Sequence, residues 1–432
     1  MSVQEYLEKH LLSRKIEEAV NAAVRAKAPD PVLFIAGHMR RAAPAVITRV
    51  RARQILDGHG APAVEVELHT NKAVHRASAA GAGALEGAAA DAAGGSERRK
   101  ILARAVADAV RVINDKVSEA LVGMDPQQQA QIDQAIMDLD KARHKAELGA
   151  NAMLAVSIAA CKAGAAEKEA PLYKHIADLV GKSATTLPVP AITVINGGKH
   201  AGNGLPIQEI MILPVGAKNF EEAMQMGSET YHHLKDIILE KCGSDSCNIG
   251  DHGGISEGLD LVIAAIERAG YNGRIKLAID VAATDFCVAH GMKCVQVAGD
   301  DLLMSDPERI KRAVSEYTCN ALVLKASIKS SILAITFLYM QANQVGTVTE
   351  AIEVVKQAKD AHWGVMVSHR SGDTEDSFIA DLAVGAAAGQ IKAGAPCRGE
   401  CLTKYNQLLR IEEELGSEGV YAGENWRTVS TS

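Results

Sequence analysis

The sequence predicts an α/β barrel over residues 146–432, preceded by a smaller α+β domain over residues 47–145 and a helical extension over residues 1–46. Over residues 146–432, helical stretches alternate with short apolar strands that end in polar turns, and this alternation favours a barrel. Three of those strands end on a charged residue: Asp280, Asp300 and Lys325. A length of 432 residues exceeds one average domain, so two or three compact units are expected.

The composition excludes several functional classes. With 47% apolar and 23% charged residues, the chain has the composition of a soluble globular protein. Its net charge of -7 argues against nucleic acid as the main partner. Residues 1–15 are polar and charged, so we expect no secretory signal. The most apolar run, residues 331–340, is too short to cross a bilayer, which needs about 20 residues, so we expect a cytoplasmic protein with no membrane contact.

The eight cysteines are scattered between Cys161 and Cys401. None forms a CxxC pair, and none has a histidine partner at the spacing of a zinc finger. Mostly apolar residues flank them, which is typical of reduced thiols in the cytosol. The sequence therefore predicts neither a structural zinc site nor a disulfide framework.

The helical extension is expected to form two amphipathic helices. Leu7, Leu11, Ile16 and Val20 recur with helical spacing, and the Ala-Pro-Asp-Pro segment at residues 28–31 interrupts the run. A short helix pair cannot bury its apolar stripe alone, so it should pack on the body of the protein or on another copy. The segment resembles the small helical dimerisation modules of the regulatory-subunit type, and the alternative is an appended hairpin with no partner.

The α+β domain is predicted from one alternating strand and a helical region. Residues 63–69 alternate as a half-buried strand, and residues 101–140 have a helical pattern. Between them, residues 77–96 are almost entirely small side chains. Such a low-complexity segment cannot form a packed core, and we expect it to be mobile.

Basic side chains follow two consecutive apolar segments near the C-terminus. Residues 363–367 form an apolar strand that breaks into the polar turn His369-Arg370-Ser371, and a second apolar segment ends on Lys392 before a Gly-Ala-Pro turn. Basic groups at the C-terminal ends of barrel strands can together hold an anion. The alternative is two ordinary strand-to-loop junctions with surface charges.

The three charged strand ends suggest a metal site with a base beside it. Strand ends direct side chains into the top of a barrel, and the carboxylates of Asp280 and Asp300 suit a hard cation such as Mg²⁺. A buried lysine near a metal can have its pKa lowered, so Lys325 could act as a base. The alternative for each residue is a capping or solvated charge.

Several long motifs resemble those of the enolases, the phosphopyruvate hydratases of glycolysis. They are Ser-His-Arg-Ser-Gly-Asp-Thr-Glu-Asp at residues 368–376, Gln-Ile-Lys-Ala-Gly-Ala-Pro-Cys-Arg at 390–398, and Tyr-Asn-Gln-Leu-Leu-Arg at 405–410. The likeness begins near residue 52 and is most similar to the plant cytosolic form with an N-terminal extension. It implies an enolase-type α/β barrel, a Mg²⁺ cofactor, a homodimer, and reversible dehydration of 2-phosphoglycerate to phosphoenolpyruvate.

The resemblance also implies roles for single residues. Lys325 matches the catalytic base, Glu209 matches a glutamate that assists the acid side, and His200 lies on the loop that closes over substrate. Asp280 and Asp300 match two of three magnesium carboxylates. The groups that bind the phosphate and carboxylate are matched by His369, Arg370, Ser371 and Lys392.

Four departures from the family pattern concern the acid, the metals and the barrel. His252 stands where the family has the proton-donating carboxylate. Asp280 and Asp300 are only 20 positions apart, so the strand that carries the third metal carboxylate is missing and the barrel is shortened. The Ala/Gly run near Ala84 replaces the serine loop of the second Mg²⁺, and about sixteen extra residues, 326–341, follow Lys325. With two carboxylates, Mg²⁺ should bind more weakly.

Two functions of different classes follow from these observations. The first is an active enolase, a hydro-lyase acting on a phosphorylated small molecule. The second is a catalytically impaired enolase-like isoform that serves as a binding or scaffold protein, with dimerisation through residues 1–46. The retained residues Lys325, Lys392, His369 and Arg370 favour the enzyme, whereas His252 and the missing metal carboxylate favour the scaffold.

Overall fold

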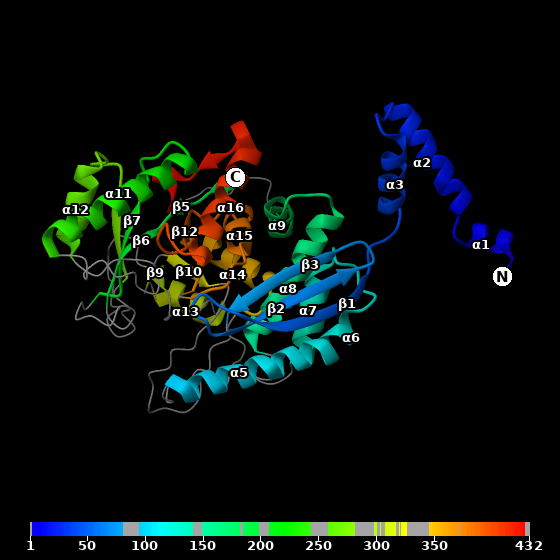
Figure 1. Cartoon of the computed structure of the whole chain (residues 1–432), viewed down its shortest axis with the longest axis horizontal. Helices are drawn as coiled ribbons and strands as arrows, with labels where there is room; N and C mark the ends of the chain where they lie inside the picture. The colour runs from blue at the N-terminus through cyan, green and yellow to red at the C-terminus, as the bar shows by residue number, and fades with distance from the viewer. Residues whose placement is uncertain are drawn as a thin grey trace.

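The structure is a computed structural model of the 432-residue chain, in which three parts follow one another along the molecule (Figure 1). It describes residues 2–80, 95–140, 149–181, 185–197, 207–242, 258–280, 298–299, 303, 307–316, 319, 321–325, 345–370 and 372–427. Of the low-complexity segment 77–96, residues 77–80 belong to a strand and bury Ala77 and Ala79 in the core, because small side chains pack well in a strand, so that part of the prediction was wrong. Residues 81–94 and the insertion at 326–341 lie outside the described residues. No helix among the described residues is long and apolar enough to cross a membrane.

The N-terminal extension consists of three helices, where the sequence predicted two. They are α1 (Val3–Lys9), α2 (Leu12–Ala26) and α3 (Pro31–Arg41). Leu11, with a positive φ of 49°, separates α1 from α2. Ser2 and Glu5 form a capping box that starts α1, and Asp30 caps α3 by accepting a hydrogen bond from the Leu33 backbone N–H at 3.0 Å. Local capping by side chains therefore fixes where α1 and α3 begin.

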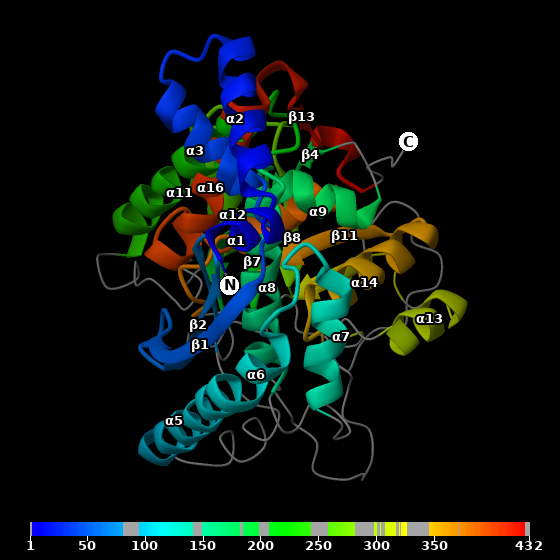
Figure 2. The same ribbon diagram turned by 90° about the vertical axis from the view of Figure 1, so that its right-hand side faces the viewer.

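Helices α2 and α3 form a hairpin that stands apart from the rest of the chain (Figures 1 and 2). Ala19 and Ala23 are the buried residues of α2. Near its base the hairpin contacts the α+β domain through the Arg40 guanidinium, which donates to the Lys72 carbonyl. An ion pair of 3.2 Å joins Arg41 to Glu169. Most large apolar side chains of the hairpin therefore stay in solvent.

The α+β domain is an antiparallel sheet covered by helices. The strands are β1 (Ile47–Leu56), β2 (Pro62–Thr70) and β3 (Val74–Ala80), in that order. The helical segments are α5 (Gly95–Val112), the π-helical turn η1 (Ile113–Val117), α6 (Ser118–Leu121) and α7 (Gln129–Leu139). The strand predicted over residues 63–69 is confirmed as β2, whose Val64, Val66 and Leu68 are fully buried.

One helix is shared between the α+β domain and the larger domain. Helix α8 (Ala150–Glu167) packs against β2 and β3 on one side and against α7, α9 (Leu172–Val180) and α14 (Val348–Asp360) on others. Fifteen of its 18 residues are buried, which explains why its sequence is apolar on every face. The two domains therefore share one continuous hydrophobic core.

The strands of the larger domain form two connected sheets. The parallel sheet has the order β5 (Val189–Pro190), β12 (Gln390–Lys392), β11 (Gly364–Ser368), β10 (Ala321–Lys325) and β9 (Ala298–Gly299). The antiparallel sheet has the order β6 (Ile192–Asn196), β7 (Glu209–Leu213) and β8 (Lys276–Asp280). Only Ala191 separates β5 from β6, so the sheets continue into each other. A separate short pair joins β4 (Thr186–Leu187) to β13 (Val420–Tyr421).

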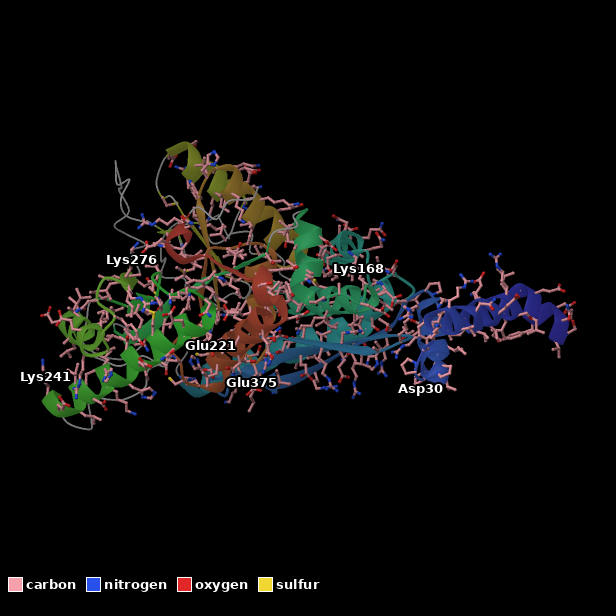
Figure 3. The ribbon with its side chains drawn as sticks, turned by 90° about the horizontal axis from the view of Figure 1, so that it is seen from above. Asp30, Lys168, Glu221, Lys241, Lys276 and Glu375 are labelled. Carbon is pink, nitrogen blue, oxygen red and sulfur yellow. The ribbon has the colours of Figure 1, made fainter. Side chains whose placement is uncertain are left out.

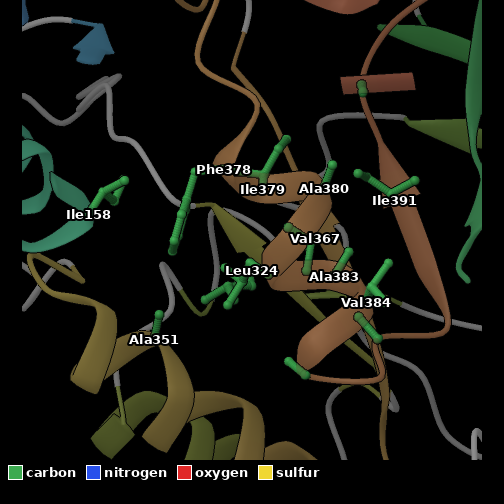
Figure 4. Close-up of a cluster of buried hydrophobic side chains, with 14 of the residues drawn as sticks. Ile158, Leu324, Ala351, Val367, Phe378, Ile379, Ala380, Ala383, Val384 and Ile391 are labelled. Carbon is green, nitrogen blue, oxygen red and sulfur yellow. The ribbon is translucent and has the colours of Figure 1, made fainter. Parts of the chain in front are cut away.

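Helices alternate with the parallel strands, as the sequence predicted. They are α13 (Pro307–Glu316) after β9, α14 after β10, α15 (Phe378–Gly385) after β11 and α16 (Gly399–Leu415) after β12. Helices α11 (Phe220–Cys242) and α12 (Leu259–Arg268) lie between β7 and β8, and the short turns η3 (Gly416–Glu418) and η4 (Gly423–Asn425) follow α16. Figure 4 shows the resulting core, where Leu324, Val367 and Ile391 meet residues of α15.

Strand β8 has an exposed side that its neighbours lack. Leu277 and Ile279 are 36% and 45% exposed, whereas β6 and β7 are buried throughout. Among the described residues, β8 pairs with β7 alone, and β9 pairs with β10 alone. The part of the barrel that the structure describes is therefore an open array with β8 and β9 at its two ends, which fits the shortening expected between Asp280 and Asp300.

Replacing a buried leucine should destabilise the chain far more than replacing the leucine at this open edge. We expect Leu324→Ala to lower the free energy of unfolding by about 2–5 kcal/mol, because Leu324 is fully buried. Leu277→Ala should cost less than about 1 kcal/mol, because its side chain is partly in solvent. Urea unfolding measures both, and equal losses would show that β8 is covered in solution.

Stability should also fall in acid because of a buried histidine. His175 in α9 is fully buried, and this burial lowers its pKa to about 4 from the ordinary 6.5. Between these values the unfolded chain binds a proton that the folded chain does not, so the unfolding free energy falls as pH decreases from about 6.5 to about 4. The slope from this one group is about 1.4 kcal/mol per pH unit. A His175→Leu variant should show a flatter profile, and an unchanged slope would contradict this origin.

Candidate functional site

The candidate site is built around the ammonium group of Lys392 at the end of β12. Its Nζ lies 2.8 Å from Oε2 of Glu209 and 2.9 Å from Oδ2 of Asp280. The side chain of Lys392 is 8% exposed, that of Glu209 is fully buried and that of Asp280 is 22% exposed. A buried cation thus holds two carboxylates that come from other strands.

Strand direction explains why these three residues meet. Asp280 ends β8, and its register partner on the antiparallel strand β7 is Glu209, the first residue of that strand. Ser368 ends β11 and lies opposite Lys392, while Lys325 ends β10 and lies opposite Ser368. The ends of four strands and the start of one therefore share a single edge of the array.

Two hydroxyl groups support this edge. The Thr193 hydroxyl in β6 donates to Oε2 of Glu209 at 3.2 Å, and the Ser368 hydroxyl donates to the carbonyl of His369 at 2.9 Å. Both residues are buried. The sequence reasoning missed them, although each is a polar residue in an otherwise apolar strand, which is the signal that could have identified them.

The anion-binding residues predicted after β11 lie beside Lys392. The backbone N–H of His369 donates to the Lys392 carbonyl at 2.9 Å, and the His369 side chain is buried. Arg370 is partly buried and follows directly. Lys404 of α16 anchors the segment that follows Arg370. This fully buried lysine donates from Nζ to the Thr374 carbonyl at 2.6 Å. The ends of β11 and β12 thus lie side by side, while joint binding of an anion by their basic side chains stays a prediction.

The α+β domain also holds this segment. The Gly58 N–H in the turn between β1 and β2 donates to the Asp373 carbonyl at 3.0 Å. The Ser78 N–H in β3 donates to Oδ2 of Asp376 at 3.0 Å, and Lys162 of α8 forms an ion pair of 2.8 Å with Asp376. The loop after the basic residues is therefore clamped between the two domains.

Of the ten site residues predicted from the sequence, Glu209, Asp280, His369, Arg370 and Lys392 are described with their side chains. Lys325 is described as the last residue of β10. The remaining four lie outside the described residues: His200, His252, Asp300 and Ser371. The structure thus brings together the residues from β7, β8, β11 and β12.

The described donors fit a cation at this edge. Two carboxylates face one ammonium group, so an excess negative charge remains beside Lys392. Asp280 is the more exposed carboxylate and the one suited to contact a hard cation. No group of three or more metal-binding side chains occurs among the described residues, which leave out Asp300.

Comparisons with known proteins agree on one family. The chain matches the family model "Enolase, N-terminal domain" over residues 47–176 and the model "Enolase, C-terminal TIM barrel domain" over residues 184–294 and 288–430. It is 54% identical over 488 residues to Cytosolic enolase 3 of Arabidopsis thaliana, covering 99% of both chains. It is 46% identical over 456 residues to Enolase of Solanum lycopersicum (89% of this chain, 98% of the relative). It is 45% identical over 456 residues to Enolase 2 of Hevea brasiliensis (88% and 98%).

The alignments also locate the differences. The alignment with the Arabidopsis relative spans 488 positions, 56 more than this chain has residues, so at least 56 positions have no counterpart here. The barrel model matches as two segments that meet at residues 288–294, between Asp280 and Asp300, where the sequence indicates a missing strand. The tomato and rubber-tree relatives leave about a tenth of this chain unmatched, which is the length of the helical extension.

Removing the buried ammonium should destabilise the site edge. We expect Lys392→Met to lower the unfolding free energy by about 3–5 kcal/mol, because it leaves the buried Glu209 carboxylate and the partly buried Asp280 carboxylate without their cation. The control is Lys276→Met in β8, which breaks an exposed pair with Glu424 and should cost less than about 1 kcal/mol. Urea unfolding compares the two, and a mild effect of Lys392→Met would show that the carboxylates do not depend on it.

Proposed function

Because the chain belongs to the enolase family, we propose that it interconverts 2-phosphoglycerate and phosphoenolpyruvate with Mg²⁺ at the edge that holds Lys392. As an enolase it is a lyase of the hydro-lyase type. The observation that carries the proposal is the convergence of Lys392, Glu209 and Asp280 from three strands, beside the buried His369. The family motifs assign Lys392 to substrate binding, Glu209 to assisting the proton donor and Asp280 to the metal.

The substrate needs an anion site and a base on one face of the barrel. Its phosphate and carboxylate would bind the basic side chains of His369, Arg370 and Lys392, with Ser371 beside them. The amine of Lys325 would then remove the proton next to the carboxylate, since β10 lies beside β11. The Glu209 and Asp280 carboxylates pair with the Lys392 ammonium and fix its direction.

Departure of the hydroxyl group requires a proton, so the product is water. Glu209 assists this acid side, and His252 occupies the position of the family's proton-donating carboxylate. A histidine can serve as a general acid. Mg²⁺, held by Asp280 and Asp300, would neutralise the charge that builds up on the substrate carboxylate.

Location and assembly follow the family. We propose a cytoplasmic protein, because the Arabidopsis relative is named a cytosolic enolase. We also propose a homodimer, the usual assembly of enolases, with a phosphorylated small molecule as the ligand. The alternative function, an impaired enolase-like scaffold, gains no support from the comparisons, all of which are with enolases.

The full chain should convert 2-phosphoglycerate to phosphoenolpyruvate when Mg²⁺ is present, as followed by ultraviolet absorbance. We expect Lys392→Ala to lower kcat about a hundredfold or more, since it removes a charge that stabilises the reacting anion. Lys276→Ala, at the start of β8 and away from the site edge, should leave kcat unchanged. Folded protein that shows no turnover with Mg²⁺ would contradict the proposal.

A further inference from the structure

The N-terminal hairpin exposes an apolar surface that nothing in the described chain covers. Figure 3 shows α1 and α2 reaching out beyond the rest of the molecule. In α2, Ile16, Val20 and Val24 are 46%, 42% and 70% exposed. Their spacing of four residues places them in one stripe along the helix. We name Ile16, Val20 and Val24 the α2 stripe.

The hairpin cannot bury the α2 stripe by itself. The contact between α2 and α3 uses the small side chains of Ala19 and Ala23, on the adjoining face of α2. Near the tip of the hairpin, Val32 and Leu33 at the start of α3 are 74% and 70% exposed and extend the apolar surface. A two-helix hairpin with its largest apolar groups in water is marginally stable alone, so this surface marks an interaction site.

The charges that border the α2 stripe would pair with those of a second, antiparallel copy of α2. Glu17 lies beside its N-terminal part, and Lys27 lies at its C-terminal end. When two α2 helices run antiparallel with Val20 opposite Val24 of the second copy, Glu17 of each faces Lys27 of the other. Both charge pairs then form at once around the apolar centre, which is the self-complementary pattern of a two-fold interface.

We propose that the α2 stripe is an interface between two copies of this chain, formed by antiparallel α2 helices with Glu17 paired to Lys27 of the second copy. The stripe, Val32 and Leu33 would be buried in this contact. The interface is separate from the barrel and from the edge that holds Lys392. It therefore adds an association site to the protein, whatever contact the barrel domains make with each other.

Charge exchange tests the proposal on the full chain. The single variants Glu17→Lys and Lys27→Glu should each weaken association about tenfold, because each places like charges opposite one another. Mixing the two variants should restore association, since the mixed pair regains both attractive contacts. The double variant should restore it as well. Sedimentation velocity over a range of concentrations measures these dissociation constants.

Two further variants make the test specific. Val20→Glu should weaken association at least a hundredfold, because it places a charge at the centre of the contact. Arg25→Glu changes the charge by the same amount as Lys27→Glu but lies on the opposite face of α2, so it should leave association unchanged. Enolase turnover should be the same in all variants, since none of these residues lies in the site.

Three results would overturn the proposal. One is equal dissociation constants for the parent, Val20→Glu and the single charge variants. Another is failure of the mixed charge variants to associate more tightly than either alone. The third is a loss with Arg25→Glu that equals the loss with Lys27→Glu, which would indicate a net-charge effect. In each case a partner other than a second copy would have to cover the α2 stripe.

Discussion

The site edge depends on one buried ammonium group placed between two carboxylates. Lys392 joins β12 to β7 and β8 through Glu209 and Asp280, and so links the parallel and antiparallel sheets of the barrel at their common edge. In a poorly hydrated environment, two carboxylates would repel each other strongly without this cation. The same contact fixes the direction of the Lys392 ammonium, the group that we propose binds the anionic substrate. In the proposed function, the stability of this edge and the binding of substrate therefore depend on the same residue.

Much of this arrangement could be predicted from the sequence because strand ends are local features. The basic residues after β11 and β12 follow apolar runs that end in polar turns, and Asp280 ends a strand in the same way. The place of Glu209 could not be found by that rule, because β7 runs antiparallel and brings its first residue to the edge. Only the family motif pointed to it. Thr193 was missed because a hydroxyl in a strand gives no sign of which distant carboxylate it contacts.

The fold was predicted to a similar degree and for similar reasons. Alternation of helices and strands is a property of neighbouring residues, and it indicated the parallel part of the barrel. Pairing between distant segments leaves no such trace, so strands β1 and β3, the antiparallel β6–β7–β8 sheet and the break of the first helix at Leu11 appeared only in the structure. The shortening of the barrel was predicted because Asp280 and Asp300 are too close in sequence to hold another strand and helix between them, whereas the open edge at β8 was found only in the structure.

Helix α8 has a consequence for how the chain is made. Its faces are covered by β2 and β3, which precede it in the sequence, and by α14, which begins at Val348, well after its own end at Glu167. At about 5–20 residues per second, roughly 10–40 seconds of synthesis separate these points. During that interval one apolar side of α8 in the nascent chain has no partner to cover it. Newly made chains of this protein therefore carry unburied apolar surface on α8 until the second half of the barrel emerges.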